Sequence, residues 1–236
     1  MEDEQFLHKT CHIIDPKDFL YLTQDMIAYE DDFFLIIDKP PGMLIHPTTY
    51  EDGNTVYDLV ERYYKARGLS FGLHPINRLD RNTSGLCVFA KEPIIQFWMS
   101  KRPVTKEYLA IVQGVPPCDK GIIEAPIART PESIITRCVN FATGKYAKTA
   151  YEVISTKKDI SLVRLRLFTG RTHQIRVHMA YIGCPLYNDN LYGTPGPQAR
   201  HALHAYRLSF KHPVSDNDLE ITRALAKDLQ KVYDNY

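Results

Sequence analysis

The stretch His74-Pro-Ile-Asn-Arg-Leu-Asp-Arg-Asn-Thr-Ser-Gly-Leu86 holds one carboxylate between two guanidinium groups and runs directly into an apolar segment. Asp80 lies between Arg78 and Arg81. Nearby positive charge favours the ionised form of a carboxylate. Such a group can act as a nucleophile or a general base, and arginine forks bind phosphate bidentately. Two interpretations fit these residues equally well. One is a site for chemistry on a polyanion, and the other is a surface salt bridge beside a strand.

Six further segments, before and after this loop, are informative through their composition and their order along the chain. They are Tyr29–Pro47, Val104–Gly114, Thr143–Tyr151, Thr169–Met179, Gly183–Gly193 and His201–Leu208. Together with the loop they resemble the ordered motifs of the RluA family of RNA pseudouridine synthases, whose signature reads roughly His-Arg-Leu-Asp-x-x-Thr-Ser-Gly-Leu. The resemblance covers roughly residues 26 to 215. Asn77 departs from it, because the family often has histidine there.

The resemblance implies an isomerase that converts specific uridines in structured RNA, ribosomal or transfer RNA, to pseudouridine. It implies that Asp80 is the catalytic carboxylate, that Tyr108 stacks on the target base, and that Arg176 pairs with the aspartate. Whether Asp80 attacks the ribose C1′ or the uracil C6, or abstracts a sugar proton, stays open. The side chains expected to bind RNA are Arg78, Arg81, Lys106, Arg171, Thr172 and His173.

Metal and cofactor sites are not expected. The reaction involves no redox change, and the five cysteines (Cys11, Cys87, Cys118, Cys138 and Cys184) form no Cys-x-x-Cys pair. Cys87 lies in an apolar run and is predicted to be a small buried hydrophobe. His173 and His178 are five positions apart, a spacing that does not place them on one helical face. We therefore predict neither a metal nor a disulfide framework.

Length and charge set the organisation. The 236 residues predict one catalytic domain over residues 26–236, with two lobes in a single fold, after a short extension over 1–25. That extension is too short for the S4-type RNA-binding domain found in many relatives. The net charge is only +1, but basic residues gather in the motifs, at Arg78, Arg81, Lys101, Arg102, Lys106, Arg164, Arg166, Arg171 and Arg176. This pattern predicts a basic cleft on a nearly neutral protein.

The acidic start lacks a signal-peptide pattern, and no apolar run is long enough to cross a bilayer. We therefore expect a cytoplasmic protein, a monomer without a membrane partner, whose partner is an RNA stem-loop.

Apolar patterning predicts an α+β fold, with a mixed, largely antiparallel bent sheet flanked by helices and a central cleft, as in the pseudouridine synthase fold. Strands are predicted over 33–37, 86–90, 107–112, 149–154 and 161–168, and helices over 54–67, 93–101 and 173–182. Thr172 is expected to cap the last helix and Gly183 to end it. Residues 218–236 are expected to form a strand and then a helix, with an apolar face made by Ala224, Leu225, Leu229 and Val232.

Two other functions compete with the isomerase. A non-catalytic RNA-binding or ribosome-assembly module could share the fold. Such a module could lose the acid at position 80 freely, so the presence of Asp80, Tyr108 and Arg176 argues against it. A glycosidase usually needs two carboxylates about 5–9.5 Å apart, and the motifs supply one acid among cations.

Overall fold

The structure is a computed structural model that describes residues 21–47, 55–70, 72–196 and 200–236. Most of the predicted extension over 1–25, and the predicted helix start at Asn54, lie outside these residues.

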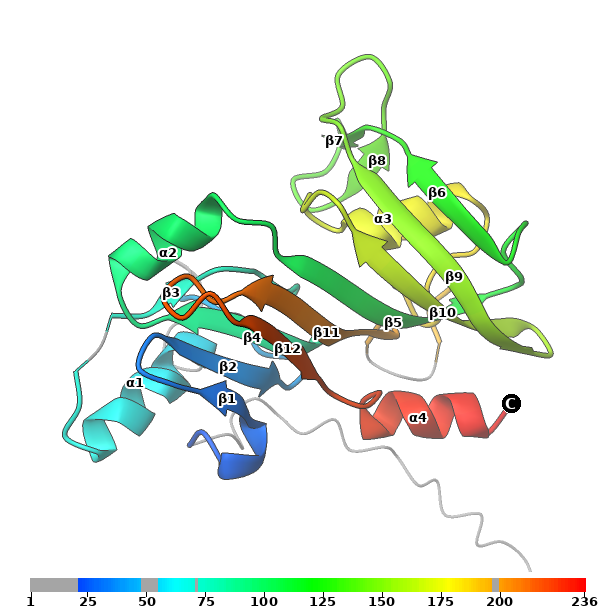
Figure 1. Ribbon diagram of the computed structural model, residues 1–236. Helices are drawn as coiled ribbons and strands as arrows, with labels where there is room; N and C mark the ends of the chain where they lie inside the picture. Colours follow the sequence, from blue (N-terminus) through cyan, green and yellow to red (C-terminus); the bar gives the residue numbers. More distant parts are fainter. Residues whose placement is uncertain (1–20, 48–54, 71, 197–199) are drawn as a thin grey trace, which may run out of the picture.

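One large sheet organises the described chain (Figure 1). Its strands follow the order β1-β2-β4-β11-β5-β10-β9-β6, with β12 paired to β11 and β3 paired to β4. All pairs are antiparallel except β4 with β11, so the predicted mixed, largely antiparallel sheet is confirmed. The strands are β1 Ile27–Glu30, β2 Phe34–Lys39, β3 His74–Pro75, β4 Ser84–Ala90, β5 Thr105–Gln113, β6 Lys120–Glu124, β9 Lys148–Lys157, β10 Ile160–Leu167, β11 Leu203–Lys211 and β12 Asp218–Thr222. A separate hairpin pairs β7 Ile127–Arg129 with β8 Arg137–Val139.

Four α-helices of the described chain pack around the sheet. They are α1 Val56–Ala66, α2 Pro93–Ser100, α3 Gln174–Tyr181 and α4 Lys227–Asp234, preceded by a short 3-10 helix, η2 Gln24–Met26. Figure 1 shows α1 and α2 on the side of β2 and β4, and α3 beside β9 and β10. None of these helices is both long and apolar enough to cross a membrane.

The strands β2 and β4 are buried on both faces. Successive side chains of a strand point to opposite faces, so Leu35 and Ile37 pack with α1 while Phe34 and Ile36 pack with α2. This two-sided burial explains why the segment is continuously apolar instead of alternating with polar residues. It also fixes the end of the β3–β4 loop, which carries Asp80, at the edge of this buried core.

Most predicted elements are confirmed with ends shifted by a few residues. Helix α1 begins after Thr55, whose side chain accepts from the Asp58 amide while Asp58 accepts from the Thr55 amide. The expected apolar face of the last helix is wrong in part, because Ala224 and Leu225 precede α4. Leu229 and Val232 are buried as expected.

Gly85 allows the parallel pair between β4 and β11 to form. Its φ is +110°, and a Cβ added there would lie 2.3 Å from the carbonyl oxygen of Ala205. Backbone atoms cannot yield as a flexible side chain does, so any larger residue must push the two strands apart. The segment that follows Asp80 depends on this close approach.

We predict that Gly85→Ala lowers the free energy of unfolding by about 3 kcal/mol or more, since it adds backbone strain to a clash inside the sheet. Urea unfolding followed by circular dichroism measures the loss. Gly170→Ala is the matched control, because a Cβ there meets nothing within 4 Å. A Gly85→Ala protein as stable as this control would contradict the assigned β4–β11 contact.

Candidate active site

A hollow of about 450 Å³ lies where the β3–β4 loop, the start of β5 and the start of α3 meet; we call it the catalytic pocket. Its lining includes the three predicted catalytic residues, Asp80, Tyr108 and Arg176. The lining also includes five of the six side chains predicted to bind RNA, namely Arg78, Lys106, Arg171, Thr172 and His173. Arg81 is exposed and does not line this pocket.

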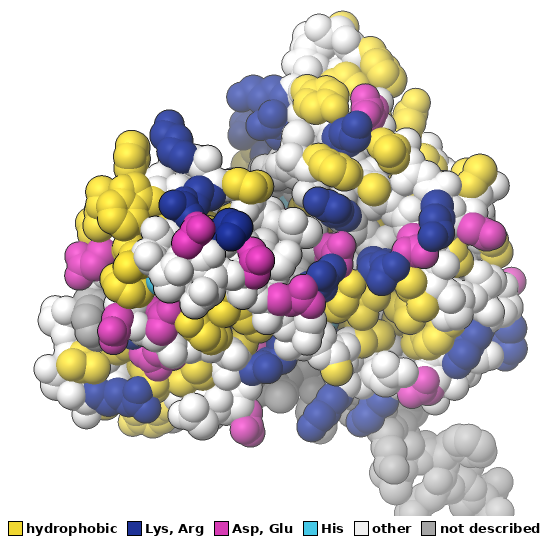
Figure 2. Space-filling view, in the orientation of Figure 1, with side chains coloured by type: hydrophobic (Ala, Val, Ile, Leu, Met, Phe, Trp, Pro, Cys, Tyr) yellow, Lys and Arg dark blue, Asp and Glu magenta, His cyan; other side chains and the backbone are white. Residues whose placement is uncertain are grey.

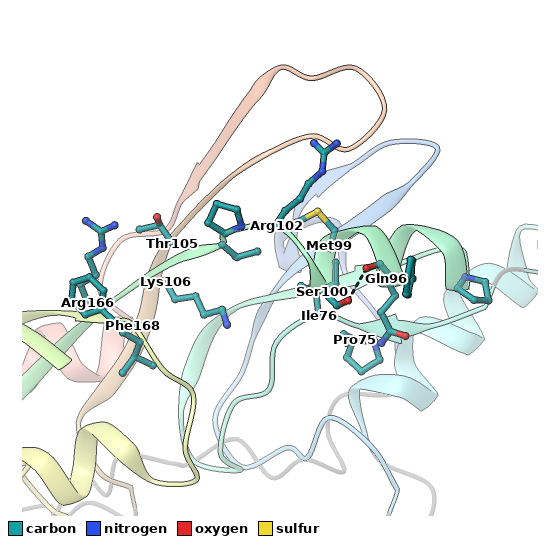
Figure 3. Close-up of a pocket in the computed structure, with 15 residues that line it drawn as sticks. Pro75, Ile76, Gln96, Met99, Ser100, Arg102, Thr105, Lys106, Arg166 and Phe168 are labelled. Atoms are coloured by element: carbon teal, nitrogen blue, oxygen red, sulfur yellow. Dashed lines mark hydrogen bonds between the residues drawn. The ribbon is translucent and has the colours of Figure 1, made fainter. Parts of the chain in front are cut away.

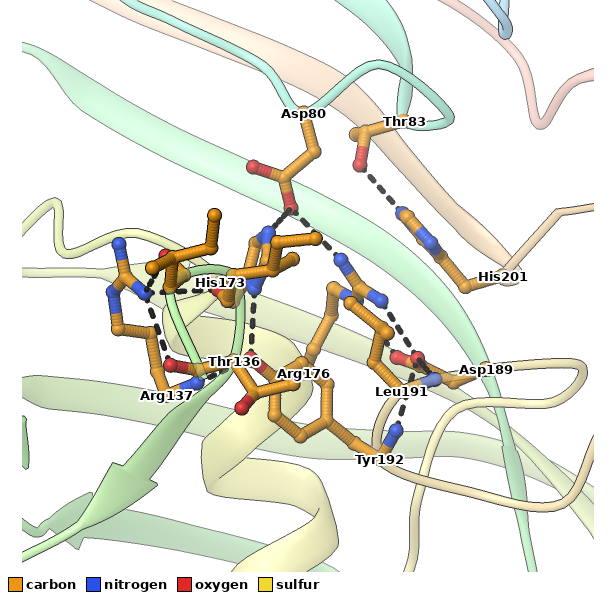
Figure 4. Close-up of polar contacts among 12 residues, drawn as sticks. Asp80, Thr83, Thr136, Arg137, His173, Arg176, Asp189, Leu191, Tyr192 and His201 are labelled. Carbon is orange, nitrogen blue, oxygen red and sulfur yellow. Dashed lines mark hydrogen bonds and ion pairs between the residues drawn. The ribbon is translucent and has the colours of Figure 1, made fainter. Parts of the chain in front are cut away.

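Arg176 lies between two carboxylates: it faces Asp80 in the pocket and is bound by Asp189 in the interior (Figure 4). Asp189 accepts two hydrogen bonds, from Arg176 Nε at 2.8 Å and from Nη2 at 2.7 Å. The remaining nitrogen, Nη1, lies 3.5 Å from Asp80 Oδ2. The bidentate contact fixes the plane of the guanidinium group, so one edge of it faces Asp80. Sequence reasoning named the pair with Asp80 and missed Asp189.

Asp189 is fully buried, whereas Asp80 keeps 28% of its side-chain surface exposed. Burial alone would raise the pKa of Asp189, but the hydrogen bonds and charge of Arg176 outweigh it and hold that pKa below its usual value. Asp80 is therefore the carboxylate that a ligand in the pocket can reach. This arrangement disfavours a two-carboxylate glycosidase, because the second acid is already bound to Arg176.

Tyr192 connects Arg176 to His173 (Figure 4). The ring of Tyr192 lies 5.0 Å below the Arg176 guanidinium, and its hydroxyl is 2.7 Å from His173 Nδ1. The other ring nitrogen of His173 is 3.9 Å from Asp80 Oδ2. Burial lowers the pKa of His173 despite the nearby Asp80 charge, so its imidazole is neutral near pH 7.

The entry into α3 corrects one prediction. Thr172 does not cap the helix; the N-cap residue is His173, in the left-handed conformation at φ 57°. The side chain of Gln174 explains this entry, because its oxygen accepts from the Arg171 amide and from the Thr169 hydroxyl. Its nitrogen donates to the Lys148 carbonyl, so the turn is tied to β9. The helix ends at Tyr181 with Ile182 as its C-cap residue, and Gly183 follows in the left-handed conformation at φ +81°, the terminating role expected for it.

The Asp80 loop is anchored by buried side chains from distant segments. Lys39 is fully buried and donates to the carbonyl oxygens of Pro40, Met43 and Arg81 at 2.8–2.9 Å. Burial lowers the pKa of Lys39 to about 7. On the other side of the loop, Thr83 contacts His201 Nε2 at 2.9 Å. Burial lowers the pKa of His201 to about 3, which keeps this ring neutral beside Arg176.

Asn77 has a structural task next to the pocket. Its amide nitrogen donates to the Leu86 carbonyl at 3.0 Å, and its amide oxygen accepts from the Val88 amide at 2.8 Å. The Asn77 side chain thus satisfies two backbone groups of β4 that a neighbouring strand would otherwise bind. The backbone after Asn77 can therefore turn away from β4 and form the Asp80 loop. The departure from the family pattern at this position is therefore compatible with an ordered loop.

Tyr108 is 95% buried, yet it lines the catalytic pocket. Burial raises the pKa of its phenol, and the neighbouring Cys87 and Asp80 add to the shift, so the hydroxyl is protonated at neutral pH. Within the described residues this hydroxyl makes no hydrogen bond, which leaves it available to a ligand. Cys87 itself is fully buried, as predicted.

His178 is occupied by the protein. Its Nδ1 lies 2.9 Å from the Thr149 hydroxyl and its Nε2 lies 2.9 Å from the Ala125 carbonyl oxygen. Both ring nitrogens are thus used to hold α3 against β9 and the segment after β6, and neither is left as a metal ligand.

Comparisons with known proteins agree with this geometry. Residues 33–181 match the model of a protein family described as RNA pseudouridylate synthase. The uncharacterized RNA pseudouridine synthase YjbO of Bacillus subtilis is 37% identical over 211 residues, 87% of this chain and 74% of that protein. The chain belongs to the RNA pseudouridylate synthase family. Among other relatives, the ribosomal large subunit pseudouridine synthase D of Zymomonas mobilis is 34% identical over 88% of this chain and 71% of its own length.

Solved structures of this synthase family share the fold. Human RNA Pseudouridylate Synthase Domain Containing 4 superposes with a TM-score of 0.71 at 23% identity, over 86% of this chain and 90% of that chain. Human RNA Pseudouridylate Synthase Domain Containing 1 gives a TM-score of 0.69 at 24% identity, over 89% and 93%. The pseudouridine synthase fold implied by the sequence motifs is confirmed.

We predict that Asp189→Asn lowers the free energy of unfolding by about 3 kcal/mol near pH 7, because it leaves the buried Arg176 charge poorly compensated. The stabilisation by Asp189 is present above its ordinary pKa and is lost as the pH falls through its lower folded-state pKa. The difference between parent and variant should therefore shrink below about pH 4. Urea unfolding at several pH values measures it.

Asp216→Asn serves as the control, since Asp216 is 75% exposed and its ion pairs with Arg102 and Lys211 are surface contacts. A pH-independent gap between the Asp189→Asn protein and the parent would show that the buried carboxylate carries no charge in the folded state.

Proposed function

We propose that this protein is an isomerase that converts specific uridines of a structured RNA to pseudouridine, with Asp80 as the catalytic carboxylate. The observation that carries the proposal is the accessible Asp80 carboxylate, which faces Arg176 Nη1 at 3.5 Å in a pocket whose other charged side chains are cationic. Family membership supports the same reaction. The target base must leave its stack to reach such a pocket.

The reaction breaks the bond between ribose C1′ and uracil N1 and forms a bond between C1′ and C5. The proton on C5 is lost and N1 gains one, so the product is an isomer and no electron acceptor is required. Asp80 supplies the carboxylate, and Arg176 orients it and keeps positive charge beside it. Asp189 acts through Arg176 and so is a positioning residue.

Tyr108 and Arg78 are assigned to the base. A tyrosine offers a flat face for stacking and a polar tip. The hydroxyl of Tyr108, whose pKa burial raises, stays protonated at neutral pH and can donate a hydrogen bond to the base. Arg78 is exposed at the pocket lining, where it can occupy the space that the extruded base leaves in the RNA.

Arg171, Lys106, Thr172 and His173 are proposed to hold the RNA backbone around the target, together with Arg81 outside the pocket. Arg171 is exposed and already bonded through Nε to the Tyr146 carbonyl at 3.0 Å, which leaves its terminal nitrogens for phosphate. A stem-loop of ribosomal or transfer RNA fits this arrangement, because specific readout of RNA targets unstacked loops. Three further expectations remain predictions: a single catalytic domain over 26–236, a monomeric state and a cytoplasmic location.

Asp80→Asn should abolish pseudouridine formation and leave the fold and RNA affinity nearly unchanged, because the exchange is almost isosteric and removes only the charge. The assay measures pseudouridine in transcribed ribosomal and transfer RNA, with chelator present and without added cofactor. Asp32→Asn, at an exposed acid outside the pocket, is the control. Substantial turnover by purified Asp80→Asn protein would remove Asp80 from the chemistry.

Tyr108→Phe should reduce turnover far more than RNA binding, since the ring stays and the hydroxyl is lost. Tyr108→Leu should weaken both, because stacking of one base on an aromatic ring contributes about 1–3 kcal/mol. Single-turnover rates and equilibrium binding on the same RNA separate the two effects. If both variants behave like the parent, Tyr108 serves only as core packing.

A further inference from the structure

A second hollow of about 760 Å³ lies beside the catalytic pocket, between α2 and the end of β10 (Figure 3); we call it the flanking groove. Figure 3 shows Arg166 and Phe168 on one wall and Gln96, Met99 and Ser100 of α2 on the other. Lys106 extends between the two walls from β5. Nothing in the chemistry assigned to Asp80 uses this space.

The flanking groove continues the catalytic pocket. Ile76, Lys106 and Leu167 line both hollows. A polymer whose target nucleotide occupies the pocket can therefore extend into the groove without leaving the protein surface. Lys106 lies at the junction of the catalytic pocket and the flanking groove, so its ammonium group can contact a ligand in either one.

The groove is positively charged. Three cationic side chains, Arg102, Lys106 and Arg166, line it, and none of its fifteen lining residues is acidic. On the face shown in Figure 2, Lys and Arg side chains border the notch between the α2 side of the molecule and strands β9 and β10. The lining thus complements a polyanion.

The cations at the junction lack carboxylate partners. Within the described residues Lys106 and Arg166 form no ion pair, whereas Arg164 is paired with Glu152 and Arg207 with Glu107 and Glu220. Arg102 has one exposed partner, Asp216, at 3.7 Å. Such an unpaired cation, half-buried at Lys106 and exposed at Arg166, can gain a phosphate contact without first breaking a salt bridge.

Two exposed aromatic rings lie in the same groove on opposite walls. Phe97 of α2 is 58% exposed and Phe168 after β10 is 50% exposed. Cationic groups accompany both rings: Lys101 lies 5.7 Å from the Phe97 ring, and Arg166 lies 5.2 Å from the Phe168 ring. Alternating aromatic faces and cations are the means by which proteins bind single-stranded nucleic acid, through base stacking and phosphate contacts.

We propose that the flanking groove binds the single-stranded RNA next to the target uridine, with bases stacked on Phe97 and Phe168 and phosphates on Lys106, Arg166 and Arg102. This inference rests on the proposed function, because it assigns the groove to the strand that enters the catalytic pocket. Duplex RNA does not suit it, since paired bases offer no free face to the two rings.

The test measures binding of two fluorescein-labelled oligouridylates, one of about four nucleotides and one of about twelve, to the full chain. Phe97→Ala and Phe168→Ala should each weaken binding of the longer RNA by roughly 5- to 150-fold and leave the shorter one nearly unaffected. Arg166→Ala should reduce the slope of log affinity against log salt by about 0.7 for the longer RNA. All three side chains are exposed, so the variants should fold.

Tyr21→Ala and Lys65→Ala are the matched controls, one exposed aromatic ring and one exposed cation outside the groove. Groove variants that bind both RNAs like the parent, or that weaken both equally, overturn the proposal. Pseudouridine formation by the parent is scored separately on ribosomal and transfer RNA. A parent without that activity whose groove variants still lose affinity only for the longer RNA would overturn the proposed function and support the groove.

Discussion

The buried ion pair between Arg176 and Asp189 is the interaction on which the geometry of the pocket depends. Both side chains are removed from water, and each would be costly to bury alone. Their two hydrogen bonds, together with the amides of Leu191 and Tyr192 that donate to Asp189, compensate this cost. The result is a guanidinium group whose position is set by the protein before any ligand arrives.

This arrangement separates two tasks that a single salt bridge would have to combine. Asp189 neutralises and orients Arg176 in the interior, while Asp80 keeps access to the pocket. The loop that carries Asp80 is then held by groups with no exposed charge of their own: the fully buried Lys39 on one side and the neutral His201 on the other. Preorganisation of this kind lets a carboxylate react without reorganising its surroundings.

Much of this could be predicted from the sequence, and what could not has a common cause. Apolar runs identified the strands β2 and β4 and the helices α1 and α2, and motif order identified Asp80, Tyr108 and Arg176. Lys39, Asp189 and His201 were missed as residues that shape the pocket because they do so through contacts between distant segments. No local pattern reveals such contacts.

Local rules failed where side chains competed with them. Thr172 is a favourable cap by residue type, but the Gln174 amide binds the preceding turn and places His173 at the cap position. Charge clustering was likewise an incomplete guide. Arg164 and Arg166 alternate on one strand, yet Glu152 pairs with the first and leaves the second in the flanking groove. Arg166 lies opposite Ala150 on β9, and Glu107, its neighbour on β5, is already paired with Arg207, so Arg166 forms no ion pair among the described residues.

The attachment of the Asp80 loop to the start of β11 has a consequence for biosynthesis. The contact between Thr83 and His201 spans 118 residues, and that between Ser84 and His204 spans 120. The ribosome must therefore add about 120 residues after Ser84 before β11 can pair with β4 and fix the segment behind Asp80. Until then the start of β4, at Ser84 and Gly85, lacks a strand neighbour on the side opposite β2, and such an unpaired edge makes a nascent chain vulnerable to aggregation. The Asp80 carboxylate is therefore fixed in position only after a segment more than a hundred residues further along the chain has been made.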